Sequence, residues 1–284
     1  MAHVAVAQIR RVTAGAGGTQ WEHAINEWQR WMRAGHRPQT TINLRGYQLR
    51  RFAAQHANRS PWELTLTDLV NWLGAHQWAA ETRRSYRASL RTFYDWAVLA
   101  GHVDRSPAAL LPAIRPPRRL PRPAPEQALR QALAASTERE RLMVMLAAYV
   151  GLRRGEVARV HTRDVEQDYD GWSLRITGKG GHVRRVPLTP AVALALRSLP
   201  LGWVFPGQVE GHLSPEYVGK LVSRLLPDGW TAHTLRHRFA TRAYAHDRDL
   251  VTVQELLGHA RIETTRIYTE APAGALRAAV MAAA

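Results

Sequence analysis

Cysteine is absent from this sequence of 284 residues, which excludes disulfide scaffolds, thiolate zinc sites and cysteine nucleophiles. Long apolar runs are also missing. The longest spans eleven residues, Leu142–Leu152, whereas a membrane helix needs roughly 20. At the amino end, Arg10 and Arg11 follow the apolar stretch, which is the wrong order for a secretory signal. We therefore expect a cytoplasmic protein with no membrane partner.

Acidic residues are scarce relative to basic ones, 23 against 39, and the formal net charge is +16. A protein this basic commonly binds a polyanion, most often nucleic acid. Lysine is nearly absent too, because only Lys179 and Lys220 stand among the 39 basic side chains. A GC-rich genome explains arginine in place of lysine, but it does not explain the excess of basic residues. The charge balance therefore indicates nucleic-acid binding.

A segment rich in proline and arginine marks a boundary within the chain. Residues 105–125 contain seven prolines and five arginines but no acidic residue. Proline at this density favours an extended spacer, and arginines along it can lie against phosphates. We expect a flexible lead-in at 1–18, a helical domain at 19–112, a basic linker at 113–125, a second domain at 126–272 and a tail at 273–284.

Apolar residues of the amino half recur at helical spacing and predict helices only, for example Trp21, Ile25 and Trp28, followed by Leu44, Tyr47, Leu49 and Phe52. A helix start is expected at Thr65–Asp68. A further helix begins near Glu81 and carries arginines opposite its apolar stripe. A basic helix face is often simply solvated, but here a basic linker follows it. The candidate DNA-binding side chains are Arg83, Arg84, Arg87, Arg91, Arg115, Arg118, Arg119 and Arg122.

The carboxyl half mixes helices with a hairpin. A buried helix is expected at 137–150, and two strands at 172–177 and 182–188 are joined by glycine-rich residues. Further helices are expected near 190–198, 214–226, 233–245, 249–257 and 262–270. The predicted fold class is mainly α with a small antiparallel β-sheet, an α+β arrangement.

Several polar residues of this half stand where a core does not need them. His233 and His237 have the i, i+4 spacing of a metal site, but the H-E-x-x-H glutamate is missing and Arg236 places a cation between them. Lys179 lies in a Gly-Lys-Gly sequence, but Gly180 replaces the Ser or Thr of a phosphate-binding loop. The sequence does not exclude a Ser-His-Asp triad, although no serine lies in a sequence typical of the tight turn that carries a nucleophilic serine.

One chemistry accounts for the whole set, namely attack of a tyrosine on a phosphodiester. Two guanidinium groups can clamp the charge that develops on the phosphate oxygens. A tyrosine with a pKa of about 10 needs a base or cationic surroundings to act as nucleophile. The leaving 5′-oxygen needs a proton, which lysine can supply and arginine cannot. In a chain that otherwise uses arginine, Lys179 at a hairpin tip is favoured as that acid over an ordinary turn residue.

Four motifs resemble those of the tyrosine recombinases, also called the phage integrase family. They are G-L-R-R-G-E at 151–156, the Gly-Lys-Gly hairpin, H-T-L-R-H at 233–237, and L-G-H followed by a tyrosine at 257–268. Their order and spacing cover the carboxyl half. The amino half resembles the family's helical core-binding (SAM-like) domain more weakly, through a Thr-x-x-x-Tyr opening and the helix before Ser106. The resemblance implies a core-binding domain followed by a tyrosine recombinase catalytic domain.

The resemblance also implies how these residues act. A covalent 3′-phosphotyrosine keeps the energy of the broken bond, so neither ATP nor a metal ion nor another cofactor is expected. Glu156 and His237 would support the site. The implied catalytic roles are phosphate clamping by Arg153 and Arg236, proton transfer from the nucleophile by His233, a bond to a non-bridging oxygen by His259, general acid catalysis by Lys179, and nucleophilic attack by Tyr268.

The implied partner is double-stranded DNA with inverted-repeat core sites. Four protomers would assemble on two duplexes and pass through a Holliday junction, with a possible accessory directionality factor. The eighteen residues expected as lead-in are too few for an arm-binding domain, so the chain resembles compact recombinases. We expect integration and excision of a phage or mobile element, in the nucleoid of a bacterial host. The alternatives are Xer-like resolution of chromosome or plasmid dimers and, in a different class, a DNA-binding regulator with an inactive site.

The tail at 274–284 is rich in alanine and other strong helix formers. A helix this short is marginal in water and needs a surface on which to pack. The resemblance implies that it is donated to a neighbouring protomer. Packing on its own domain and a degradation tag ending in Ala283 and Ala284 are the alternatives.

Overall fold

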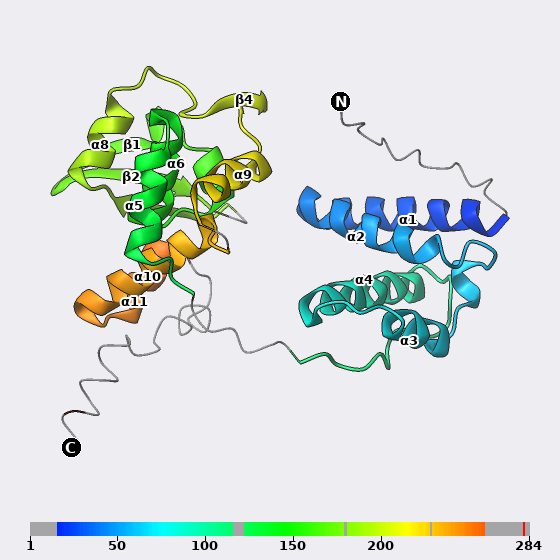
Figure 1. Ribbon diagram of the computed structural model, residues 1–284. Coiled ribbons are helices and arrows are strands. Elements are labelled where there is room, and N and C mark those ends of the chain that lie inside the picture. The colour runs from blue at the N-terminus through cyan, green and yellow to red at the C-terminus, as the bar shows by residue number, and fades with distance from the viewer. Residues whose placement is uncertain (1–15, 116–121, 179–180, 228, 259–280, 282–284) are drawn as a thin grey trace, which may run out of the picture. The chain divides into compact units, whose positions relative to one another are not determined.

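The computed structural model describes residues 16–115, 122–178, 181–227, 229–258 and 281 (Figure 1). The chain forms two compact units, Met1–Arg118 and Arg119–Ala284, and the division falls within the segment predicted as a basic linker. Throughout the described ranges, helices long and apolar enough to cross a membrane are absent.

The amino-terminal unit consists of helices, as predicted. They are α1 (Ala16–Ala34), α2 (Gln39–Ala53), α3 (Leu66–Gly74) and α4 (Ala80–Leu99), with a short 3-10 helix at Pro61–Glu63. Figure 1 shows α1 beside α2, and α2 also packs against α4. The helix α1 begins at Ala16, so residues 16–18 of the expected lead-in are helical, and residues 1–15 lie outside the described residues. Gly17 and Gly18 lie in the first turn of α1, and a glycine within a helix costs about 1 kcal/mol relative to alanine. The free energy gained by burial of the Trp21 side chain one turn later outweighs this cost.

Aromatic rings fill the core of this unit. Trp21, Trp28, Phe52 and Phe93 are all at most 1% exposed. Their rings meet edge to face or stacked, and the centroids of Trp21 and Phe93 are 5.8 Å apart. Aromatic pairs at this separation add to the energy gained from burial alone. Most tryptophans of the amino half are therefore core residues.

The helix start predicted at Thr65 is confirmed by its hydrogen bonds. The Thr65 backbone N–H donates to the Asp68 carboxylate at 2.8 Å, and the Asp68 N–H donates to the Thr65 hydroxyl at 3.4 Å. This reciprocal capping satisfies two backbone donors that a helix leaves without partners. Bonds from Thr65 and Arg59 lower the pKa of Asp68 to about 2.

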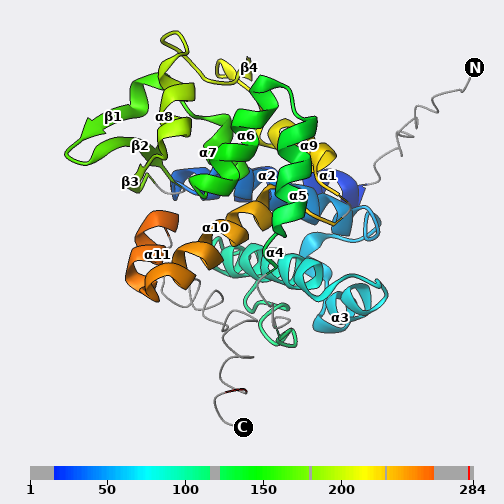
Figure 2. The same cartoon turned by 60° about the vertical axis from the view of Figure 1, so that its left-hand side comes forward.

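The carboxyl-terminal unit combines helices with a small sheet and confirms the predicted fold class. The sheet has the order β1-β2-β3, with both pairs antiparallel. Figure 2 shows α10 and α11 next to each other, and α6 packs against α5, α8, α9 and α10. The elements are α5 (Glu126–Ala135), α6 (Glu138–Tyr149), α7 (Arg154–Ala158), β1 (Val165–Asp168), β2 (Gly171–Thr177), β3 (Val183–Pro187), α8 (Pro190–Arg197), β4 (Pro206–Val209), α9 (Pro215–Leu225), α10 (Ala232–Asp247) and α11 (Leu250–Leu257).

Strand β1 was not expected from the sequence. Its four residues, Val165–Asp168, include three polar ones, and its side chains are half-buried or exposed. An edge strand of this kind lacks the apolar alternation by which a strand is predicted. The two expected strands form β2 and β3, with Leu174 opposite Val186 and Ile176 opposite Arg184.

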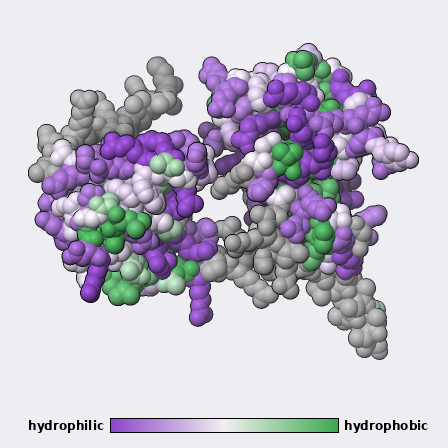
Figure 3. Space-filling model, turned by 180° about the vertical axis from the view of Figure 1, so that it is seen from behind, coloured by the Kyte–Doolittle hydropathy of each residue, from purple (hydrophilic) through white to green (hydrophobic). Residues whose placement is uncertain are grey.

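Hydrophobic side chains form only separate patches on the molecular surface shown in Figure 3. Two apolar residues that the sequence analysis names for their helical spacing are exposed to solvent. The side chain of Leu44 is 50% exposed and that of Tyr47 is 59% exposed. Ile42, Leu49 and Phe52 instead form the buried face of α2. Leu44 and Tyr47 thus lie in a helix, as predicted, but on its exposed face.

Candidate active site

The turn before α7 places Arg153 and Glu156. Gly151 has φ +72°, and a Cβ atom at this position would collide with the Phe239 ring, so only glycine fits. Arg153 then precedes the first residue of α7, with extended backbone angles. Its backbone N–H donates to the Glu156 carboxylate at 2.9 Å. The Gly-Leu-Arg-Arg-Gly-Glu sequence thus encodes a tight turn that carries its own cap.

Glu156 is the buried centre of an arginine cluster. Its side chain is 3% exposed and accepts a bond from Arg153 Nη1 at 2.8 Å. Arg184 donates to both carboxylate oxygens, at 3.1 and 2.8 Å. Burial alone would raise the pKa of Glu156, but the bonds from Arg184 and Arg153 and the nearby charge of Arg236 lower it to about 2. Glu156 is therefore a carboxylate at neutral pH.

Sequence reasoning missed Arg184. This residue of β3 has a side chain that is 10% exposed, and its register partner is Ile176. Because side chains alternate along a strand, Arg184 shares the inward face with Val186, while Arg185 points outward. That alternation separates Arg184 from Arg185 once the burial of Val186 is known.

The carboxyl end of α11 anchors the arginines through backbone carbonyls. Arg184 donates to the Leu256 carbonyl oxygen at 2.9 Å, and Arg153 donates to that of Leu257 at 3.4 Å. Cations are favoured here, because the last carbonyls of a helix have no partner within it and carry its negative end. Gly258 ends the helix at φ +62°, and a Cβ there would lie 2.9 Å from Arg184 Cδ.

Arg236 joins this cluster from α10. Its side chain is almost fully buried and donates to the carbonyl oxygens of Gly151 and Leu257, the latter at 2.6 Å. Its Nη1 also lies 3.6 Å from the Glu156 carboxylate. Arg153 and Arg236, which the sequence pattern pairs, therefore meet at Glu156 and at the Leu257 carbonyl.

His233 and His237 face each other one turn apart on α10. Their Nε2 atoms are 2.9 Å apart, and the backbone N–H of Arg122 donates to His237 Nδ1 at 3.2 Å. Burial, which has the largest effect, and the neighbouring charges of His233 and Arg236 together lower the pKa of His237 to about 4. His237 is therefore neutral at pH 7.

Three predicted catalytic residues lie outside the described residues, namely Lys179, His259 and Tyr268. Two of them directly follow described positions, since Gly178 precedes Lys179 and Gly258 precedes His259. Of the predicted DNA-binding arginines, Arg118 and Arg119 also lie outside the described residues.

The arginines predicted on one face of α4 have different surroundings. Arg83 donates to the His76 carbonyl oxygen at 2.9 Å, and Arg87 donates to that of Leu111 at 2.7 Å. Arg84 forms an exposed pair at 3.2 Å with a glutamate one turn earlier. Arg83 and Arg87 thus also hold parts of their own unit together.

The remaining predicted arginines occupy other positions. Arg91 is half-buried on α4, and Arg115 is exposed at the end of the first described segment. In the carboxyl-terminal unit, the Arg122 guanidinium lies over the Trp230 ring, 4.7 Å from its centroid. An arginine in this position forms a cation–π contact.

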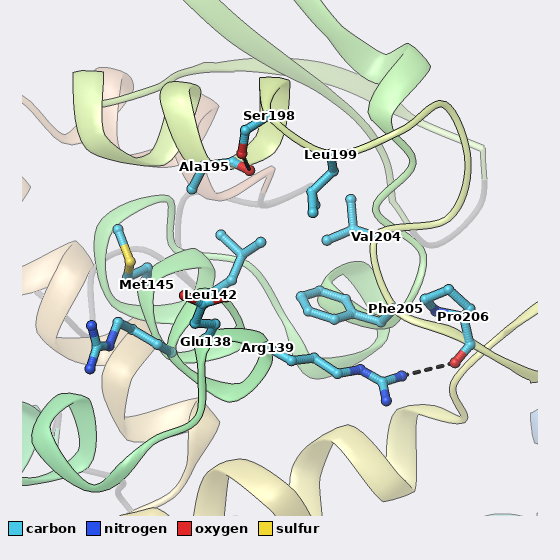
Figure 4. Close-up of a pocket in the computed structure, with 11 residues that line it drawn as sticks. Glu138, Arg139, Leu142, Met145, Ala195, Ser198, Leu199, Val204, Phe205 and Pro206 are labelled. Carbon is cyan, nitrogen blue, oxygen red and sulfur yellow. Dashed lines mark hydrogen bonds between the residues drawn. The ribbon is translucent and has the colours of Figure 1, made fainter.

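A separate apolar pocket of about 680 Å³ lies between α6, α8 and the segment before β4 (Figure 4). Leu142, Met145 and Phe205 line it, and Arg139 at its rim donates to the Pro206 carbonyl oxygen at 2.8 Å. The pocket shares no residue with the arginine cluster. An apolar lining does not suit a phosphate, so the arginine cluster is the candidate active site.

Comparisons with known proteins agree with these motifs. Residues 124–273 match the model of the phage integrase family. The chain is 33% identical to the tyrosine recombinase XerC of Rhodospirillum centenum, over 88% of this chain and 83% of that protein. It is 32% identical to XerC of Mesorhizobium japonicum, over 78% of this chain and 81% of that protein.

Solved structures show the same fold. A XerH site-specific recombinase bound to a palindromic difH substrate matches with a TM-score of 0.71 and 22% identity, over 94% of this chain and 84% of that chain. A lambda integrase dimer bound to a COC′ core site matches with a TM-score of 0.69 and 18% identity, over 88% and 77%. The resemblance expected from the motifs is confirmed: the chain belongs to the phage integrase family, the tyrosine recombinases, enzymes that cut and rejoin DNA.

Proposed function

We propose that this recombinase cuts a DNA strand by attack of Tyr268 on a phosphodiester, which forms a 3′-phosphotyrosine and releases a 5′-hydroxyl. The observation that carries the proposal is the meeting of Arg153 and Arg236 at one carboxylate and one backbone carbonyl. Two guanidinium groups held at one point can bind the non-bridging oxygens of a phosphate and stabilise the charge that develops there.

The charge balance of the cluster supports a phosphate ligand. Three guanidinium groups, from Arg153, Arg184 and Arg236, surround the single carboxylate of Glu156, which leaves two positive charges in excess. The side chains of Arg184 and Arg236 are buried, whereas that of Arg153 is 42% exposed. In the proposed mechanism, Arg153 binds the phosphate from the exposed side of the cluster and Arg236 binds it from the buried side. Glu156 holds these side chains in place and does not react.

The proton transfers fall to residues around this cluster. We assign the general acid to Lys179, whose hairpin is tied to the cluster because Arg184 on β3 donates to Glu156. His233 takes up the proton of the attacking hydroxyl, and His237 is its neighbour on α10, with the two Nε2 atoms 2.9 Å apart. His259, which follows the end of α11, bonds a non-bridging oxygen. The reaction conserves the phosphodiester energy in the tyrosine ester, so it requires no ATP.

We further propose that the amino-terminal unit is a core-binding domain that contacts double-stranded DNA at inverted-repeat core sites. Its net positive charge and the arginines of α4 and the linker support this assignment. Four protomers assemble on two duplexes, with the tail at 274–284 donated to a neighbour and an accessory factor setting the direction. The similar XerH and lambda integrase structures are bound to DNA.

For the biological role, we propose integration and excision of a phage or mobile element. Resolution of chromosome or plasmid dimers is a second candidate, which the 33% identity to a XerC protein over 88% of this chain favours. The two roles differ in their substrates. A plasmid with two directly repeated copies of one site should be resolved in the second case, whereas integration joins two non-identical sites.

A nicked suicide substrate tests the cutting reaction. The wild-type protein should form a covalent protein–DNA product that resists denaturation, and Tyr268→Phe should bind the same DNA without forming it. Arg236→Lys keeps a positive charge but loses the planar fork, so it should bind DNA and cut far more slowly. Covalent product with Tyr268→Phe would refute the nucleophile. DNA binding without covalent product in the wild type would indicate a regulator with an inactive site.

A further inference from the structure

The segment that leads into the carboxyl-terminal unit is bonded to the first turns of α10. The backbone N–H of Ala124 donates to the Thr234 carbonyl oxygen at 3.0 Å, and Ala124 is 3% exposed. Two residues earlier, the Arg122 guanidinium lies over the Trp230 ring. A cation over an indole face stabilises such a contact. This part of the linker is therefore docked on the helix that carries His233.

The bond from Arg122 fixes the position of a proton on the neighbouring ring. A backbone N–H can only donate, so His237 Nδ1, at 3.2 Å, is an unprotonated acceptor. The proton of the neutral ring is then on Nε2, which faces His233 Nε2 at 2.9 Å. His237 therefore donates to His233, and the proton of a neutral His233 is on Nδ1. His237 is neutral at pH 7, since burial together with the neighbouring His233 and Arg236 lowers its pKa to about 4.

We propose that Arg122 is a positioning residue that holds the two histidines in a resting proton arrangement through its backbone N–H. This inference rests on the proposed function, in which His233 takes up the proton of the attacking hydroxyl. While the Nε2 lone pair of His233 accepts the proton of His237, that atom cannot take up another one. The docked linker therefore keeps the base occupied.

Release of the linker would allow the proton of His237 to move from Nε2 to Nδ1, and the ring would stay neutral. Once the Arg122 N–H no longer occupies His237 Nδ1, this nitrogen can take a proton from water while Nε2 gives one up. His237 then no longer donates to His233 Nε2, and this atom can take up the proton of the attacking hydroxyl. A movement of the linker, for example when DNA binds along it, would thus prepare the site for cutting.

Two substitutions at one position separate the backbone from the side chain. Arg122→Ala removes the guanidinium but keeps the backbone N–H, whereas Arg122→Pro removes both. The sequence neighbours of Arg122 are Pro121 and Pro123, and a residue before proline already favours the extended conformation that proline adopts. The difference between the two variants therefore reports the N–H alone.

The first readout is the protonation of the histidine rings in the full-length protein without DNA. In the ¹⁵N spectrum of histidine-labelled protein, assigned with a His237→Gln variant, we expect His237 to show an unprotonated Nδ1 and a protonated Nε2. Arg122→Ala should keep this pattern, and Arg122→Pro should show both tautomers. A protonated Nδ1 in the wild type, or identical spectra for the two variants, would overturn the proposal.

The second readout is the rate of covalent product formation in a single turnover on a nicked substrate. Arg122→Pro should cut roughly 2- to 10-fold faster than Arg122→Ala, the effect expected for the loss of one neutral hydrogen bond. An equal or slower rate would overturn the resting-state role. Absence of covalent product in the wild type would contradict the proposed function instead, and the ring spectra would still decide the proton arrangement.

Discussion

Replacement of Glu156 by glutamine isolates the electrostatic contribution of the arginine cluster, because it keeps the size of the side chain and removes its charge. The carboxylate is 3% exposed, bonded to Arg153 and Arg184, and 3.6 Å from Arg236. Removal of one partner from a buried ion pair costs about 3–5 kcal/mol, since the other charge stays buried. We expect Glu156→Gln to lower the free energy of unfolding of the carboxyl-terminal unit by about 3 kcal/mol at pH 7.

The pKa of Glu156 supplies a second estimate and a sign. Burial would raise it, but the surrounding arginines lower it from 4.5 to about 2. Since one pKa unit corresponds to about 1.4 kcal/mol, the ionised group contributes on the order of 3 kcal/mol. The folded-state pKa lies below the unfolded one, so this contribution is complete above pH 4.5 and is lost as the pH falls toward 2. The stability difference between wild type and Glu156→Gln should shrink over this range.

Hydrogen exchange measured by mass spectrometry at increasing urea concentration suits this test, because it follows the two units separately. Peptides from α6 report the core of the carboxyl-terminal unit. The control is Glu255→Gln, the same change at an exposed residue of α11, which should alter stability by less than about 0.5 kcal/mol. Equal stabilities of wild type and Glu156→Gln at pH 7, or a difference that stays constant from about pH 5 to about pH 3, would refute the reasoning.

Other predictions follow from the same structure. Gly258→Ala should destabilise the carboxyl-terminal unit by about 1–3 kcal/mol in a thermal melt, because the left-handed backbone and Arg184 leave no room for a Cβ; an unchanged melt would contradict this. Arg84→Ala combined with Arg91→Ala should reduce the slope of log K for DNA against log salt by up to about 2, and an unchanged slope would show that both are merely solvated. Lys179→Arg should fail on ordinary DNA but cut a 5′-phosphorothiolate substrate, whose leaving sulfur needs no proton; equal defects on both substrates would mean that Lys179 acts only as a charge.

Two motifs of the carboxyl half contain residues that the structure brings together, since Arg153 and Glu156 of the first and Arg236 of the third meet in the arginine cluster. Gly151 with its positive φ and the cap from Glu156 to Arg153 are properties of a short segment. The importance of Arg184 is not local, since it depends on the approach of the end of α11 to β3. Two arginines in a row on a strand give no reason to prefer one until the buried face is known.

Periodicity predicted helices more reliably than it predicted which face is buried. At 100° per residue, positions 44 and 47 lie about 200° and 140° from position 42 around α2, so Leu44 and Tyr47 are on the face opposite Ile42. Helical spacing therefore does not by itself tell which apolar residues of α2 are buried. The short polar strand β1 was missed because it is held by pairing with β2 rather than by its own apolar pattern.

The attachment of the arginines to the end of α11 also means that the arginine cluster is complete only after that helix has been synthesised. Arg153 and its carbonyl partner, Leu257, are 104 positions apart in the chain. At a translation rate on the order of 10 residues per second, the ribosome exposes the arginine several seconds before it makes the anchor. A growing chain can therefore be attracted to nucleic acid by its charge before it has an assembled site.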